Sequence, residues 1–178
     1  MNRNVPTINT ARITLRAMRP GEFERFAQIW AMPDVVRHIG GIPRDRASSW
    51  DRFLFNAGHW QVTGYGQWAI EDHETKAMVG QAGFFIRDRG IDPEWDAIPE
   101  AGWVLVPELH GRGLGFEAVQ AAHDWFDRVI TGPLACLVHP DNAPSLKIAA
   151  RLGYTPVRDV TYQESPARMM LRKSVPQA

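Results

Sequence analysis

Three glycines at alternate positions, Gly111, Gly113 and Gly115, form the segment of this chain with the clearest chemical use. Glycine lets the backbone curl, so that successive N–H groups point into one concavity. A helical pattern follows the turn, and a helix N-terminus adds unpaired N–H groups and the positive end of a dipole. Arg112 adds a charged contact. The turn therefore predicts a site for a phosphate or pyrophosphate group.

Three interpretations compete for this turn. A P-loop is excluded, because no Gly-Lys-Ser/Thr sequence closes the turn. A dinucleotide site fits better, because Gly113-x-Gly115-x-x-Ala118 matches its fingerprint and Asp141 follows the next apolar stretch. However, residues 107–112 separate the preceding strand from Gly113, and few elements remain for the second half of a dinucleotide fold. The third interpretation is a simple loop, so the neighbouring segments must decide.

The elements that must position the turn follow from the periodicity of the apolar residues. Expected strands cover residues 12–16, 67–71, 78–86, 100–106, 134–138, 155–162 and 168–173. Expected helices begin at Pro20, cover 46–57, follow the glycine turn with the stripe Val119, Ala122, Phe126 and Val129, and cover 144–152. Residues 88–99 are polar and proline-bearing, which predicts a loop. No linker interrupts the pattern, so we expect a single domain over residues 1–178.

Composition excludes several functional classes. Twenty basic and twenty acidic residues give zero formal net charge, whereas nucleic-acid binding usually requires a basic excess, so we expect no nucleic-acid partner. No apolar stretch approaches the about 20 residues of a membrane helix, so we expect no membrane partner and a cytoplasmic location. The histidines lack metal-ligand spacing, so we expect no metal. The only cysteine, Cys136, lies in an apolar stretch typical of a buried thiol.

The order of segments along nearly the whole chain resembles the GNAT superfamily, and within it the branch of Rim-type ribosomal-protein N-terminal acetyltransferases. The matching segments are residues 10–16, 32–41, 67–70, 78–83, 100–105, 110–118 and 141–154. The glycine turn is similar to the acetyl-CoA signature of that family, and Asn142-x-x-Ser145 to the segment that follows it. Two positions depart from the pattern: His110 stands where the superfamily usually has Gln or Arg, and Pro144 is unusual.

The resemblance implies an α/β (α+β) protein with a single GNAT fold. Its central sheet would be mixed, largely antiparallel and twisted, with about six to seven strands splayed at the cofactor site and helices on its flanks. Acetyl-CoA would be the co-substrate, with its pantetheine arm bonded in the gap like an added strand. The cofactor-binding residues it implies are Leu105, Val106, His110, Gly111, Arg112, Gly113, Leu114, Gly115, Phe116, Asn142 and Lys147 or Arg151.

The reaction implied by the resemblance is direct attack of a neutral amine on the thioester, through a tetrahedral intermediate. This chemistry needs a proton acceptor for the ammonium group and hydrogen-bond donors for the oxyanion and the leaving thiolate. Glu100 matches the expected base, acting through a water, and Ser145 the donor to the thiolate. Asn142 would orient pantetheine or the amine. From the residues alone, a solvated strand-end carboxylate at Glu100 and a helix N-cap at Asn142 stay open.

The acceptor implied is a small-molecule amine or a protein N-terminus, held between the first two helices and the loop that joins the last two strands. The aromatic residues between positions 50 and 68 would form either an aromatic acceptor pocket or part of the core. Two other functions stay open: a catalytically idle module that binds or senses acyl-CoA, and a NAD-dependent oxidoreductase built on the same turn. Many relatives pair, so a homodimer is also open.

Overall fold

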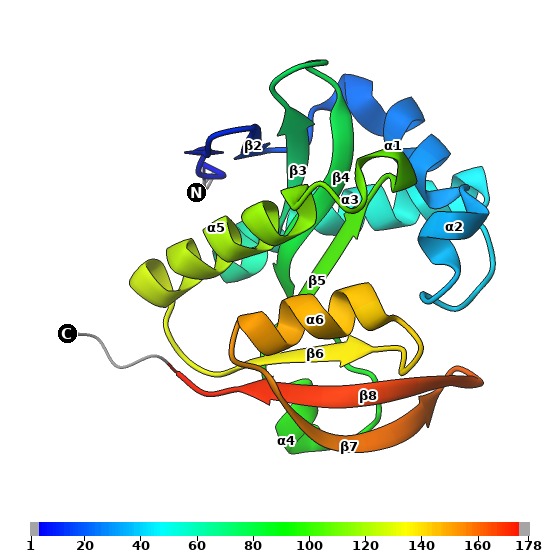
Figure 1. Ribbon diagram of the computed structural model, residues 1–178, viewed down its shortest axis with the longest axis vertical. Coiled ribbons are helices and arrows are strands. Elements are labelled where there is room, and N and C mark those ends of the chain that lie inside the picture. Colours follow the sequence, from blue (N-terminus) through cyan, green and yellow to red (C-terminus); the bar gives the residue numbers. More distant parts are fainter. Residues whose placement is uncertain (1–3, 175–178) are drawn as a thin grey trace.

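A mixed sheet of eight strands runs through the computed structural model, which describes residues 4–174 (Figure 1). The strands are β1 (Ile8–Asn9), β2 (Ile13–Arg16), β3 (Gln67–Asp72), β4 (Met78–Phe85), β5 (Glu100–Leu105), β6 (Leu134–Val138), β7 (Thr155–Tyr162) and β8 (Ser165–Arg172). The helices are α1 (Phe23–Trp30), α2 (Pro33–Val36), α3 (Arg46–Thr63), α4 (Pro93–Asp96), α5 (Leu114–Val129) and α6 (Ala143–Arg151). Single 3₁₀ turns precede α1 and follow β5.

The strand order is β1-β2-β3-β4-β5-β6-β8-β7, and every neighbouring pair is antiparallel except β5 and β6. These two parallel strands pair only where Glu100 faces Ala135, beside a hydrogen bond of 2.9 Å from the Ala135 N–H to the Pro99 carbonyl oxygen. Beyond that point they diverge, which opens a gap in the middle of the sheet. The expected mixed, splayed sheet is confirmed, with the two-residue β1 raising the strand count to eight.

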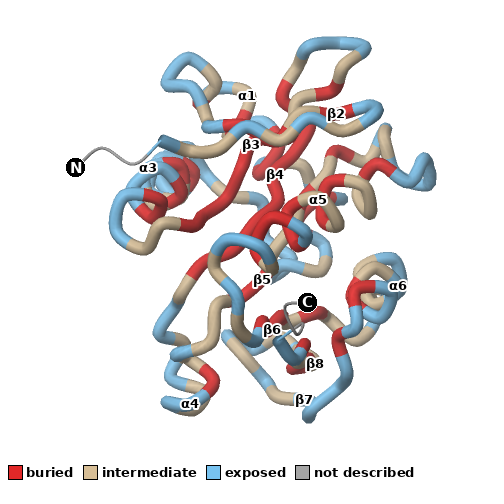
Figure 2. Tube along the Cα trace, turned by 90° about the vertical axis from the view of Figure 1, so that its left-hand side faces the viewer, coloured by how far each residue is buried: buried red, intermediate tan, exposed pale blue. Residues whose placement is uncertain are grey.

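Helices cover both faces of the sheet, with α1 and α3 on one side and α5 and α6 on the other (Figures 1 and 2). Every residue of β4, which lies between these layers, is buried. The largest fully buried side chains include Trp68, Phe26, Phe84 and Phe126. A strand buried on both faces favours small or apolar residues, and β4 supplies them except at Gln81, which hydrogen-bonds to Asn56 and Gln67. This core fixes the strands that border the gap.

Helix α3 is longer than the sequence pattern predicts. It continues past Gly58 to Thr63 and ends at Gly64, whose φ of +84° glycine adopts without strain. His59 and Trp60 are buried on its last turns, and the Trp60 indole N–H donates to the Gln67 carbonyl oxygen at 3.1 Å. Tertiary packing therefore outweighs the helix-weakening effect of one exposed glycine.

The expected loop at residues 88–99 contains the one-turn helix α4. The Asp92 carboxylate caps it by accepting hydrogen bonds from the N–H groups of Glu94 and Trp95. Trp95 is buried against Ala135 and Met169, so this segment covers the sheet near β6 and β8. No helix among the described residues has the length and apolar character required to cross a bilayer.

Candidate active site

The glycine turn forms a cradle of amide groups at the N-terminus of α5. Gly111 and Gly113 have φ angles of +74° and +79°, which other residues adopt only with strain. The amide N–H groups from Gly111 to Phe116 donate no hydrogen bond to any other described residue. Six free N–H groups at the start of a 16-residue helix suit an anion. The turn therefore fits the pyrophosphate that its sequence predicts.

A carboxylate on α5 connects the cradle to the segment between β1 and β2. The pattern of residues did not predict this contact. The Glu117 carboxylate accepts hydrogen bonds from the Thr10 hydroxyl at 2.6 Å and from the Arg12 N–H at 3.0 Å and Nε at 2.7 Å. Arg12 Nη1 also donates to the Arg112 carbonyl oxygen at 2.8 Å. Burial alone would raise the pKa of Glu117, but these hydrogen bonds lower it. These bonds anchor the Arg112 carbonyl and the first turn of α5, whereas Gly111 and Gly113 remain exposed.

The register between β4 and β5 decides which backbone groups face the gap. The Val106 N–H donates to the Val79 carbonyl oxygen at 2.9 Å, and its carbonyl accepts from the Leu109 N–H at 3.1 Å. The Val106 N–H is therefore engaged, whereas its carbonyl oxygen keeps a second lone pair, so the expectation that the Val106 backbone bonds pantetheine stays a prediction. Hydrogen-bonding directions alternate along a strand, so the backbone groups of Trp103 and Leu105 point away from β4 into the gap.

The side chains expected around the cofactor differ in what they contact. His110 Nε2 lies 2.8 Å from the Leu105 carbonyl oxygen, and Arg112 lies 3.8 Å from the Glu74 carboxylate. Lys147 is exposed on α6. The Arg151 guanidinium stacks on the Phe116 ring, 3.4 Å from its centroid. Arg112, Lys147 and the stacked Arg151 therefore keep N–H donors that can reach a bound anion, whereas His110 Nε2 is engaged by the Leu105 carbonyl.

Ser145 and Asn142 lie together at the N-terminus of α6, beside β5. The Asn142 side-chain oxygen accepts a hydrogen bond of 3.2 Å from the Ser145 N–H, which confirms its interpretation as an N-cap. The Ser145 hydroxyl oxygen accepts a hydrogen bond of 3.2 Å from the Trp103 indole N–H. Because that bond occupies an oxygen lone pair, the hydroxyl hydrogen stays available to donate.

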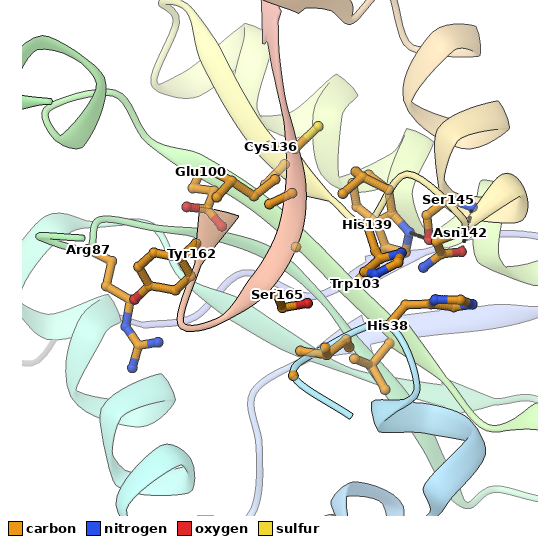
Figure 3. A pocket seen from close by; sticks show the side chains of 18 of the residues that line it. His38, Arg87, Glu100, Trp103, Cys136, His139, Asn142, Ser145, Tyr162 and Ser165 are labelled. Carbon is orange, nitrogen blue, oxygen red and sulfur yellow. Dashed lines mark hydrogen bonds between the residues drawn. The ribbon is translucent and has the colours of Figure 1, made fainter. Parts of the chain in front are cut away.

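Glu100 lies buried at the start of β5, whereas Ser145, on α6, contacts the strand further along, at Trp103. Both of its carboxylate oxygens accept hydrogen bonds from Arg89, at 2.7 Å and 2.6 Å. Three residues of strand, about 10 Å, separate it from Trp103, and the close-up view shows it at the opposite end of the pocket from Ser145 (Figure 3). The alternative of a solvated strand-end carboxylate is wrong, since only 7% of Glu100 is exposed.

A pocket with a cavity volume of about 210 Å³ connects these two ends. His38 and Gly40, from the loop after α2, line it on one side, and Tyr162 and Ser165, from the turn between β7 and β8, line it on another (Figure 3). These are the segments between which the resemblance locates the acceptor. The six aromatic residues between positions 50 and 68 do not line it, and Phe53, Trp60, Tyr65 and Trp68 are buried in the core instead.

Two imidazole rings lie at the Ser145 end of the pocket (Figure 3). The ring centroids of His38 and His139 are 5.2 Å apart. His139 Nδ1 accepts a hydrogen bond of 3.1 Å from the Asp141 N–H, which assigns the proton of the neutral ring to Nε2. Partial burial and the proximity of His139 lower the pKa of His38 below 6.5. His38 therefore stays available as a base near neutral pH, and no pattern in the sequence points to it.

Cys136 also borders the pocket, but its chemistry is that of a buried structural thiol. Burial raises its pKa, so the reactive thiolate does not form near neutral pH. Within residues 4–174 there is no group of three or more His, Cys, Asp or Glu side chains arranged to hold a metal ion. The reactive groups of the pocket are therefore its hydroxyl, imidazole, carboxylate and guanidinium side chains.

Known proteins resemble this chain along most of its length. YkkB of Bacillus subtilis strain 168 is 26% identical over 167 residues, which cover 93% of this chain and 94% of YkkB. A protein described as a GnaT-family acetyltransferase from Bordetella pertussis has a TM-score of 0.85 at 28% identity and covers 94% of this chain and 99% of its own. An acetyltransferase from Agrobacterium tumefaciens strain C58 has a TM-score of 0.80 at 29% identity, covering 96% of each chain.

The family itself is identified by a match over strands β2 to β6, the amide cradle and the Asn142–Ser145 segment. The acetyltransferase (GNAT) domain family matches residues 12–155, which is well over half of the chain. The same residues contain the splayed strands β5 and β6 and the α5 N-terminus described above. This protein therefore belongs to the GNAT acetyltransferase family.

Proposed function

We propose that this protein transfers an acetyl group from acetyl-CoA to a primary amine, either a small-molecule amine or a protein N-terminus. The observation that carries the proposal is the amide cradle at residues 111–116, which opens beside the gap between β5 and β6. A pyrophosphate in the cradle would direct the pantetheine arm along the free edge of β5, past Leu105 and Trp103. Its end would then reach Ser145, where the acceptor pocket begins.

Bound acetyl-CoA would supply the acetyl group as an activated thioester. The amine nitrogen forms a bond to the thioester carbon, the carbon–sulfur bond breaks, and the products are an amide and CoA thiol. The Ser145 hydroxyl would donate a hydrogen bond to the sulfur as negative charge develops there. The Asn142 amide, whose oxygen caps α6, would use its NH₂ group to orient the pantetheine arm or the amine. In balance, one proton leaves the amine and one joins the sulfur.

Because of where the side chains lie in the pocket, we assign the proton acceptor to a different residue from the one that the resemblance implies. The resemblance implies Glu100 acting through a water, but both of its oxygens accept hydrogen bonds from Arg89 at the far end of the pocket. His38 lies at the Ser145 end, and its lowered pKa keeps it neutral at pH 7. We therefore propose His38 as the acceptor of the amine proton, with Glu100 as the alternative that the resemblance implies.

More distant proteins of the same fold support the choice of cofactor. RimL, a ribosomal-protein alpha-N-acetyltransferase solved in complex with coenzyme A, has a TM-score of 0.75 at 15% identity. The aminoglycoside acetyltransferase AAC(6′)-Ib, also in complex with coenzyme A, has a TM-score of 0.72 at 16% identity. Their acceptors differ, and at these identities they share only the fold with this chain. Membership of the Rim-type branch therefore stays a prediction.

Release of free thiol from acetyl-CoA tests the proposed function. Purified protein is incubated with acetyl-CoA and a panel of primary amines and peptides with free N-termini, and thiol is measured against a protein-free blank. We expect release that depends on the amine and an acetylated product of matching mass. Binding of acetyl-CoA without thiol release from any amine would contradict the proposal and favour the idle acyl-CoA-binding module.

A further inference from the structure

Four arginine side chains line the pocket, and they outnumber its acidic groups. Arg44 comes from the loop before α3, Arg52 from the second turn of α3, and Arg87 and Arg89 from the segment that follows β4. The only carboxylate among the described residues that line this pocket is that of Glu100. In a chain of zero formal net charge, this is a local excess of positive charge at the site where the acceptor would bind.

Glu100 does not neutralise this charge, because Arg89 already engages both of its oxygens. Arg44, Arg52 and Arg87 form no ion pair with any described carboxylate. Unpaired charges in a partly buried site are costly, and proteins usually compensate them with a counter-charge. The pocket therefore suits a negatively charged ligand.

Aromatic rings hold these cations in place without using their N–H groups. The Arg52 guanidinium lies 5.2 Å from the ring centroids of both Phe55 and Phe85, and its Nε is buried without a hydrogen-bond partner. Arg44 stacks on Trp30 at 4.7 Å. Burial, together with repulsion from Arg87 and Arg44, lowers the pKa of Arg52 to about 9, so it still carries its charge at pH 7. Stacked guanidinium groups with free N–H donors are a preferred partner of oxyanions.

We propose that the acceptor is a small amine whose carboxylate is several bonds away from its amine, such as an ω-amino acid, and that Arg52, with Arg44 and Arg87, binds that carboxylate. This inference rests on the proposed function, because it names the acceptor of the same site. The cavity of about 210 Å³ suits a molecule of this size. The amine would extend from the arginines toward His38 and Ser145 (Figure 3). A cationic acceptor with several amines would be repelled by the same arginines.

The positive charge also favours the reactive form of the amine. An ammonium group near guanidinium groups loses its proton more readily, because like charges disfavour the charged form. The attacking species is the neutral amine, so the arginines would both hold the acceptor and increase its reactive fraction. This double use distinguishes the cluster from a surface patch of basic residues, which would act only through steering.

The test compares ω-amino acids with their carboxamides, such as 5-aminopentanoate with 5-aminopentanamide, at saturating acetyl-CoA. The carboxamide has the more weakly basic amine and so more of the neutral form, which means that a preference for the acid cannot come from amine basicity. We expect kcat/KM from thiol release to be at least about tenfold higher for the acid. Arg52→Met should remove this preference by slowing the acid at least about tenfold and the carboxamide less than about twofold.

A matched control is Arg46→Met on the same helix, because Arg46 pairs with Glu24 outside the pocket. It should change neither substrate. Folding is checked by urea unfolding, and Arg52→Met should be at least as stable as the wild type, since it removes a charge that lacks a partner. Equal or faster turnover of carboxamides by the wild type, or acetylation restricted to peptide N-termini, would overturn the inference and leave the acetyltransferase function intact.

Binding decides the inference if no amine is acetylated, an outcome that would already contradict the proposed function. Calorimetric titration of the amino acid into protein saturated with CoA, which occupies the amide cradle, reports the carboxylate site alone. Binding that Arg52→Met abolishes and Arg46→Met preserves would support the anion site. No binding of the amino acid to the wild-type protein would overturn it.

Discussion

Replacing Gly113 with alanine isolates the backbone conformation that the amide cradle needs. Gly113 has φ and ψ of 79° and 0°, in the left-handed region. A Cβ atom added there meets only Arg12 Nη2, at 3.5 Å, which is an ordinary contact. The substitution therefore adds conformational strain without a steric clash. The left-handed conformation costs a residue other than glycine about 1–2 kcal/mol.

The strain should appear in ligand binding. Gly113 is exposed, so the free loop can relax and must be returned to the cradle conformation when the pyrophosphate binds. A cost of about 1–2 kcal/mol corresponds to acetyl-CoA binding that is weaker by about 5-fold to 30-fold. Isothermal titration calorimetry of acetyl-CoA with the wild type and Gly113→Ala measures this ratio directly.

Gly64→Ala is the matched control for this experiment. Gly64 ends α3 with φ and ψ of 84° and 4°, nearly the values of Gly113, but it precedes the buried Tyr65 and lies outside the cradle. Its strain should lower the free energy of unfolding by about 1–2 kcal/mol and leave acetyl-CoA affinity unchanged. Unchanged affinity in Gly113→Ala, or an equal loss of affinity in both variants, would refute the cradle.

Three further predictions concern pH and catalysis. Burial lowers the pKa of His123 from 6.5 to about 4, so the unfolded chain takes up this proton first as pH falls, and the free energy of unfolding should drop by about 3 kcal/mol between pH 6.5 and 4. Urea unfolding across that range measures the drop. The drop should disappear in the double variant His123→Phe/Tyr154→Phe, because the titrating imidazole is removed. Tyr154 is changed as well, so that its hydroxyl is not left buried without its hydrogen-bond partner. Ser145→Ala should lower kcat about 100-fold with acetyl-CoA affinity within about twofold of wild type, and full activity would exclude the serine from the mechanism. His38→Gln should remove the acidic limb of the pH profile of kcat/KM, whereas loss of that limb in Glu100→Gln alone would assign the proton transfer to Glu100.

The features that sequence could predict are those encoded locally. The glycine turn, its following helix and the cap at Asn142 each depend on residues a few positions apart, and all three occur as expected. The side of β5 that faces the gap depends on its register with β4, so the sequence alone cannot separate the backbone groups of Leu105 and Trp103, which face the gap, from the Val106 N–H, which bonds Val79. The length of α3 likewise depends on the burial of Trp60 against the sheet, which outweighs the signal of Gly58.

The polar lining of the pocket depends on contacts between distant segments. Arg52 lies on α3 and Arg87 after β4, and only the folded chain brings them to the same pocket without a carboxylate partner. Separately, each residue reads as an ordinary charge on an amphipathic element. The same holds for His38, which comes from the loop after α2 and meets His139 only through the fold. The amide cradle was therefore predictable from local sequence, whereas the charge of the pocket required the structure.

Parallel calorimetric titration of the wild-type protein with acetyl-CoA and with NAD tests whether the amide cradle and the gap between β5 and β6 together bind acetyl-CoA. Both ligands carry a pyrophosphate, but only acetyl-CoA carries the pantetheine arm that the gap between β5 and β6 would accept. We expect saturable binding of acetyl-CoA with one site per chain and no comparable binding of NAD. Tighter binding of NAD than of acetyl-CoA would contradict it.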